Sequence, residues 1–255
     1  MVEQPVTGSV TGCFLRVRRR RLIAHPSPQS HSSMGHEIYL EVGAKRVFAG
    51  AIDWPGWCRH GPDESSALGA LVDHAPRYAA VVRPDRLGFS VPARISELRV
   101  VERLVGNATT DFGALGVIPS ADRAPVAVGD GARFERLIRA GWRGFDAARK
   151  RAEGKVLQKG PRGGGRNLES IVRHVVDADA GHLAAIGWKQ PGRAAASLDD
   201  TRAAVLAALG AALRGELPAR GPRGGTRWPV RFFVRRVVWH ALAHAWEIER
   251  RLAGP

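Results

Sequence analysis

The stretch VRFFVRRVVWHALAHAWEIERRL at residues 230–252 decides how the second half of this chain folds. Its apolar residues recur with a period of about 3.6, which predicts a helix buried over most of its circumference. His240 and His244 stand at i and i+4 on one face, and Glu247 continues that stripe at i+7. Two imidazoles on one buried stripe can share a metal ion, or each can be bonded to an ordinary acceptor.

The same periodicity precedes this helix and replaces a period of two near residue 130. Gly/Pro-rich loops separate the segments, and each segment carries an apolar stripe. The four predicted helices span 131–153, 168–186, 198–214 and 230–252. Four helices of this length predict an all-α four-helix bundle over residues 130–252.

The first half of the chain alternates apolar and polar residues as strands do, and it predicts a small α+β domain over residues 34–125. Its first two strands predict a hairpin, and Pro76 is expected to kink or split its helix. The expected elements are strands at 36–42 and 46–54, a helix at 62–82, strands at 87–91 and 98–104, and a loop at 106–125.

The net charge of +15 is distributed unevenly along the 255 residues. Residues 1–33 carry five Arg and one Glu, residues 34–129 are close to neutral, and residues 130–255 carry an excess of twelve positive charges. The first 33 residues lack the apolar run of an export signal and predict a disordered basic tail. Two interpretations of it stay open: an over-extended start before Met34, or a tail that contacts phosphates.

Composition excludes several classes of protein. No window approaches about 18 uninterrupted apolar residues, so no membrane span is expected. Two cysteines, Cys13 and Cys58, cannot form a disulfide framework or a four-cysteine zinc site. The predicted compartment is therefore a reducing cytoplasm.

A third histidine strengthens the metal hypothesis. His174 lies near the middle of the second predicted bundle helix, as His240 does in the last, so packed helices would bring them level. Three converging imidazoles would leave at least one coordination position open. His182, two turns further along the same helix, competes with His174 for this place.

This order of helices resembles the DinB/YfiT-like metalloenzymes. The resemblance rests on Arg173-His174-Val175-Val176 and on the run from Trp239-His240 through His244-Ala245-Trp246-Glu247-Ile248, and it covers about residues 130–252. It implies a divalent ion bound by His174, His240 and His244 inside a four-helix bundle. Members with known chemistry are S-transferases or isomerases that use a low-molecular-weight thiol, or hydrolases.

A metal enzyme acting on a small molecule is therefore the expected function. The expected ion is Zn, with Ni or Fe as alternatives, and a low-molecular-weight thiol is the second expected cofactor. Such an ion lowers the pKa of water or a thiol enough to generate a nucleophile at neutral pH. Glu247 is the candidate catalytic residue, as a general base or as an orienter of a ligand imidazole, unless it merely pairs with Arg250 or Arg251.

Two similar loops supply candidate substrate-binding residues. Each precedes a predicted bundle helix and places glycines beside arginines, which suits anion binding at a helix start. A plain up-down-up-down bundle would put both loops at one end, whereas the crossover between the second and third helices that the resemblance implies would put them at opposite ends. Flexible basic linkers are the alternative interpretation. The candidates are Arg162, Arg166, Arg223 and Arg227.

The first half has a weaker likeness of its own. Phe48 to Trp57, followed by Gly61-Pro62-Asp63-Glu64, is similar to the strand, turn and helix of HicB-like minidomains. The alternative function is therefore a non-enzymatic module that interacts with nucleic acid or protein and whose histidines are structural. We expect a small-molecule substrate, allow for a homodimer, and expect neither nucleic acid nor a membrane as partner.

Overall fold

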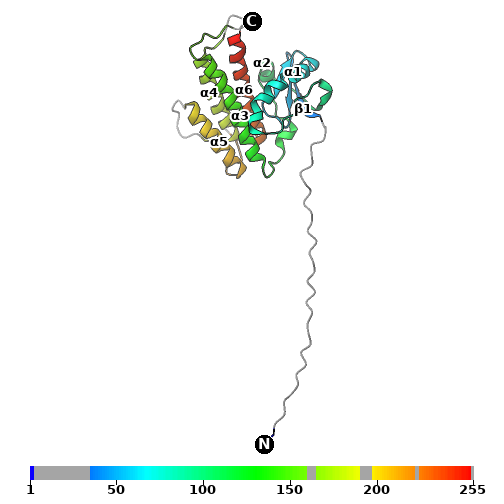
Figure 1. Cartoon of the computed structure of the whole chain (residues 1–255), viewed down its shortest axis with the longest axis vertical. Helices are drawn as coiled ribbons and strands as arrows, with labels where there is room; N and C mark the ends of the chain where they lie inside the picture. The colour runs from blue at the N-terminus through cyan, green and yellow to red at the C-terminus, as the bar shows by residue number, and fades with distance from the viewer. Residues whose placement is uncertain (3–34, 160–164, 190–196, 222–223, 254–255) are drawn as a thin grey trace. The chain divides into compact units, whose positions relative to one another are not determined.

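A computed structural model of the chain describes residues 1–2, 35–159, 165–189, 197–221 and 224–253 (Figure 1). The expected basic tail lies almost wholly outside the described residues. The residues from Gly35 onward form one compact unit in which a sheet is followed by helices. This confirms an α+β part followed by a helical part, while the division into two domains near residue 125 stays a prediction.

The sheet has four strands in the order β3-β2-β1-β4. β1 pairs antiparallel with β2 as the predicted hairpin, β2 pairs antiparallel with β3, and β1 pairs parallel with β4. β3 was not expected, since its sequence CRHG has no apolar alternation. The strands are β1 (His36–Val42), β2 (Val47–Ala51), β3 (Cys58–Gly61) and β4 (Leu98–Val105).

Helix α1 (Glu64–Val82) is capped at its N-terminus by Asp63, whose carboxylate accepts a hydrogen bond from the Ser66 amide. Pro76 does not split this helix, which continues through it to Val82, and its side chain is exposed. The prediction of a strand at 87–91 is wrong. Phe89 there packs its ring on an aromatic cluster instead of pairing its backbone, and that cluster contains Trp54, Trp57 and Tyr78.

The predicted long helices are present with ends within two residues of expectation. They are α3 (Asp130–Ala152), α4 (Leu168–Ile186), α5 (Leu198–Leu213) and α6 (Val230–Ala253). The stretch expected to be loop holds one short helix, α2 (Ala108–Phe112), capped by Asn107. α6 contacts α3 and α4, and α5 contacts the same two helices. Each of the four therefore buries its stripe against neighbours within one shared core.

End contacts fix the direction of the four helices. The Trp228 amide, just before α6, donates to the Ala185 carbonyl near the end of α4, so α4 and α6 run antiparallel. Arg231 near the start of α6 pairs with Asp130 at the start of α3, so these two run parallel. Arg202 early in α5 pairs with Asp146 late in α3, which makes those helices antiparallel. Consequently α4 and α5 run in the same direction, as a crossover connection requires.

Helix α6 also ties the helical part to the sheet. Gly56 has a φ of +94°, and a Cβ there would lie 2.6 Å from a Val238 methyl, so only glycine lets this turn approach α6 so closely. Further along the same face, Arg235 donates to the Ala51 carbonyl at 2.6 Å. Helix α6 thus packs against α3, α4 and the sheet, and different side chains of α6 contact each of them.

Candidate metal centre

Three histidines from two helices converge at the junction of α4 and α6. His240 and His244 project from the middle of α6, and His174 projects from the facing part of α4. Nε2 of His240 lies 3.3 Å from Nε2 of His174 and 3.2 Å from Nε2 of His244. The ligand atoms of the three residues all lie within 4.8 Å of one another, close enough to hold one metal ion.

The spacing of the nitrogens suits a tetrahedral cation. Zinc binds imidazole nitrogen at about 2.0–2.1 Å, and the corresponding edge of a tetrahedron is about 3.3 Å. The two shortest separations are 3.2 and 3.3 Å, at the length of that edge. A pair of imidazoles could share a proton at this separation, but the Nε2 of His240 faces two neighbours and can donate to only one.

The surroundings favour the neutral form of His240 and His174, the form that binds a metal ion. Burial, followed by repulsion from His244, lowers the pKa of His240 well below its usual range and lowers that of His174 as well. His240 is the most buried of the three, with 7% of its surface exposed. The nitrogen lone pairs of these two histidines are therefore available for an ion at neutral pH.

A carboxylate orients one of the rings. His244 donates from Nδ1 to Oε2 of Glu247 at 2.8 Å, which leaves its Nε2 free to face the other histidines. The second oxygen of Glu247 accepts from Arg251 at 3.1 Å, and Arg251 also donates to the Gln158 carbonyl. The hydrogen bond from His244, then the contact with Arg251, lowers the pKa of Glu247. Glu247 thus combines ring orientation with an ion pair to Arg251, not Arg250.

His182 is not part of the cluster. It lies further along α4, almost fully buried, and its Nδ1 lies 3.2 Å from a carboxylate oxygen of Asp179. Its ring centre is 5.7 Å from that of His240. The structure therefore brings His174, and not His182, to the ligand position.

Replacing Glu247 with glutamine should weaken metal binding by about 10- to 100-fold, since the amide holds the His244 proton less firmly. The affinity can be measured by competition with a chromophoric chelator. Glu249→Gln is the matched control, because Glu249 lies on the same helix and pairs with Arg77 and Arg151 instead. Unchanged affinity together with a lowered catalytic rate would instead make Glu247 a general base.

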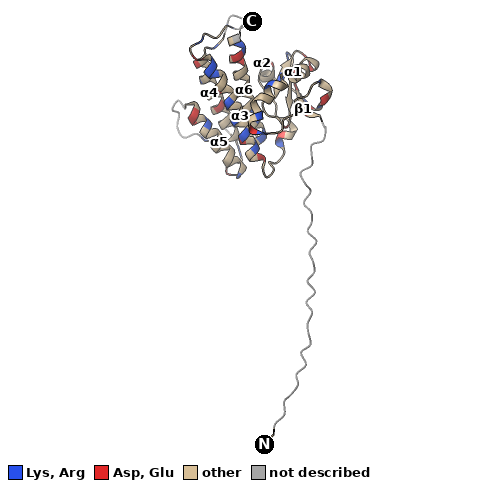
Figure 2. Ribbon diagram, viewed as in Figure 1, with Lys and Arg blue, Asp and Glu red and all other residues tan. Residues whose placement is uncertain are grey.

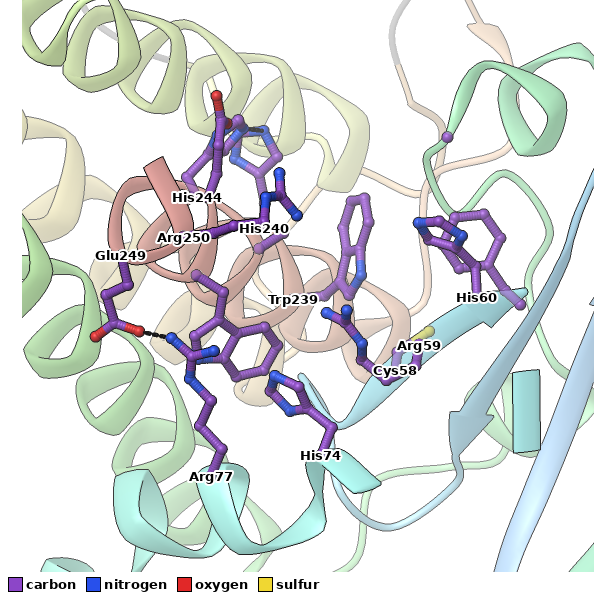
Figure 3. A pocket seen from close by; sticks show the side chains of 15 residues that line it. Cys58, Arg59, His60, His74, Arg77, Trp239, His240, His244, Glu249 and Arg250 are labelled. Atoms are coloured by element: carbon purple, nitrogen blue, oxygen red, sulfur yellow. Dashed lines mark hydrogen bonds and ion pairs between the residues drawn. The ribbon is translucent and has the colours of Figure 1, made fainter. Parts of the chain in front are cut away.

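The cluster opens onto a cavity of about 660 Å³ between α6, α1 and β3 (Figure 3). His240 and His244 form part of its wall. The opposite wall comes from the sheet and α1, and it carries side chains that the sequence analysis did not assign to any site. They include Arg59, His60, His74 and Arg77. A cavity of this size accommodates a small organic molecule.

The predicted substrate-binding arginines are not brought together. Arg162 and Arg223 lie outside the described residues. Arg166 precedes α4 and lies near enough to His174 to affect its pKa, whereas Arg227 lies beside Gly187 at the other end of α4. Arg166 and Arg227 thus lie at opposite ends of α4, and neither lines the cavity.

The thiol of Cys58, the cysteine within the described residues, is unsuited to act as the nucleophile. Cys58 lines the cavity but is 5% exposed, and burial raises its pKa to about 12. The charge of the neighbouring Arg59 favours the thiolate, but desolvation outweighs it.

His74 should make the stability of the protein sensitive to acid. Burial, followed by Arg59, lowers its pKa to about 3, so between about pH 6.5 and 3 the unfolded chain binds a proton that the native state does not. Stability is then lost as the pH falls through this window. In metal-free protein, His74→Phe should reduce the loss between about pH 7 and pH 5 by about 1 kcal/mol, allowing for partial exposure. Urea unfolding at both pH values measures this difference, and an unchanged loss would contradict it.

No protein-family model, curated protein or solved structure matches this chain. Within the described residues, no helix is long and apolar enough to cross a membrane.

Proposed function

We propose that the protein is a divalent-metal-dependent enzyme of the DinB/YfiT-like type that acts on a small molecule. The observation that carries this proposal is the convergence of the imidazole nitrogens of His174, His240 and His244, two of which, His240 and His244, line a cavity large enough for a substrate. The directions of α3, α4, α5 and α6 support it, since they correspond to the four-helix bundle with a crossover that the resemblance implies.

In this proposal the histidines and Glu247 of the centre have distinct roles. His174, His240 and His244 hold the ion, and Glu247 keeps the His244 ring in the tautomer that presents Nε2. A divalent cation in such a site supplies Lewis-acid activation of water or a thiol at neutral pH. The thiol of Cys58 is buried, so we assign thiol-dependent transfer or isomerisation to an external low-molecular-weight thiol. Hydrolysis requires only water.

The interaction-module alternative has less support. Trp57 is fully buried and donates to the Leu71 carbonyl, so it belongs to the core and cannot stack on a base. Basic and acidic residues are interspersed along α3 (Figure 2), in contrast to the continuous basic stripe expected for phosphate binding.

Cobalt substitution can test the proposal and separate its two branches. Protein stripped with a chelator and reloaded with Co²⁺ is titrated with cysteine or glutathione, and the visible spectrum is recorded. Thiol-dependent chemistry predicts a new sulfur-to-cobalt charge-transfer band, absent from His244→Ala. A spectrum unchanged by thiol leaves hydrolysis, which is then assayed with activated esters and amides. Equal rates in stripped and reloaded protein would contradict metal-dependent catalysis.

A further inference from the structure

The cavity beside the three histidines has an excess of positive charge. Figure 3 shows Arg59, Arg77 and Arg250 around it, from β3, α1 and α6. Two carboxylates also line the cavity, but both are already paired. Glu247 is bound by His244 and Arg251.

The second carboxylate, Glu249, pairs with two arginines at once, Arg77 and Arg151. Within the described part of the chain, no carboxylate forms an ion pair with Arg59 or Arg250. These two guanidinium groups therefore line the cavity without a counter-ion from the described residues.

Arg59 is held in place although it lacks an acidic partner. Its guanidinium lies 5.9 Å from the centre of the Trp246 ring, within the range of a cation–π contact. Burial, and then repulsion from Arg250, lowers the pKa of Arg59. An anion bound by both arginines would offset the desolvation of the Arg59 charge and the repulsion between the two guanidinium groups. An arginine pair of this kind favours bidentate carboxylate or phosphate groups.

His74 adds a second sign of a polar ligand. Its ring packs on Trp246 with centres 4.0 Å apart, and both of its nitrogens are buried without a hydrogen-bond partner among the described residues. A buried imidazole with two unpaired nitrogens is costly unless a ligand or water supplies the partner. It lines the same cavity as Arg59.

We propose that Arg59 and Arg250 form an anion subsite that binds a carboxylate or phosphate group of the substrate. This inference rests on the proposed function, because it assigns the substrate of the metal centre to the class of small organic anions. Arg59 and Arg250 line the same cavity as His240 and His244, so a substrate bound by its anionic group can extend toward these two histidines. The sheet thus contributes to substrate recognition, and the two parts of the fold form one site.

Isothermal titration of the full chain with inorganic phosphate and with succinate tests the subsite. Arg59→Gln and Arg250→Gln should each weaken binding of the preferred anion at least about 10-fold, the loss of one charge-assisted contact. The anion that binds more tightly indicates whether the anionic group of the substrate is a phosphate or a carboxylate. Arg94→Gln removes the same charge from an exposed residue paired with Glu97 outside the cavity, and should change the affinity less than about 2-fold.

The same titration separates this inference from the metal proposal. His240→Ala and chelator-treated protein should still bind the anion within about 3-fold of the parent, because the arginines remain. Loss of anion binding on metal removal would show that the anion binds the ion instead, and would overturn the subsite. Equal affinities in Arg59→Gln, Arg250→Gln and the parent would also overturn it, as would no binding of either anion. Circular dichroism of each variant checks that it is folded.

Discussion

Protein carrying His240→Ala should be purified almost free of metal, whereas the parent chain holds about one equivalent. His240 occupies the centre of the cluster, with its Nε2 within 3.3 Å of both other ligand nitrogens. Removing it leaves two imidazoles. The loss of metal affinity should exceed the roughly 100-fold loss expected when a residue that only orients a ligand, such as Glu247, is replaced. Elemental analysis after extensive dialysis measures the content, and His174→Ala should behave in the same way.

His182→Asn is the matched control for this experiment. His182 lies on α4 like His174 and is more buried, but it faces Asp179. The variant should keep about one equivalent of metal. Full retention in both His240→Ala and His174→Ala would contradict the three-histidine site. Retention in His174→Ala with loss in His182→Asn would assign the third ligand to His182.

Replacing Asp122 with alanine should lower the free energy of unfolding by about 3–5 kcal/mol, the cost of leaving a buried charge without its partner. Asp122 accepts two hydrogen bonds from Arg235, at 2.7 and 2.8 Å, and both residues are 2% exposed. Arg235 also donates to the Ala51 and Ile52 carbonyls, so this pair connects α6 to the end of β2. Urea unfolding followed by tryptophan fluorescence gives the value.

The double variant Asp122→Ala/Arg235→Met supplies the control. It removes both charges, so it should recover a large part of the stability that the single variant loses. A loss below about 1 kcal/mol in Asp122→Ala would show that water reaches Arg235 and that the pair is not an anchor. In contrast, removing the exposed pair of Arg94 and Glu97 should change stability by less than about 1 kcal/mol.

The helices and the metal ligands could be predicted because their information is local. A 3.6-residue period and capping residues such as Ser197 define α5 and its neighbours within two residues of their ends. The i, i+4 spacing of His240 and His244 fixes two ligands on one helix face. His174 followed from its level on a facing helix, although its rival His182 could be set aside only by its contact with Asp179.

The cavity wall could not be predicted, because it depends on how the sheet docks on α6. β3 has no apolar alternation, and its Arg59 reaches the cavity only because the turn at Gly56 packs against Val238. Leu87 and Phe89 have the spacing of a strand, but Phe89 packs against Trp57 and the segment is not among the four strands of the sheet. The glycine-arginine loops had the clearest sequence pattern for anion binding, yet Arg227 lies far along α4 from the end that Arg166 occupies.

Anomalous diffraction from crystals of the zinc-loaded protein tests whether the three histidines bind one ion. A single strong peak is expected at the zinc edge, about 2.0–2.1 Å from Nε2 of His174, His240 and His244. The fourth position is expected to face the cavity toward Arg59. A peak bound by His182 and Asp179 instead, or no peak between α4 and α6 in zinc-saturated crystals, would contradict the three-histidine site.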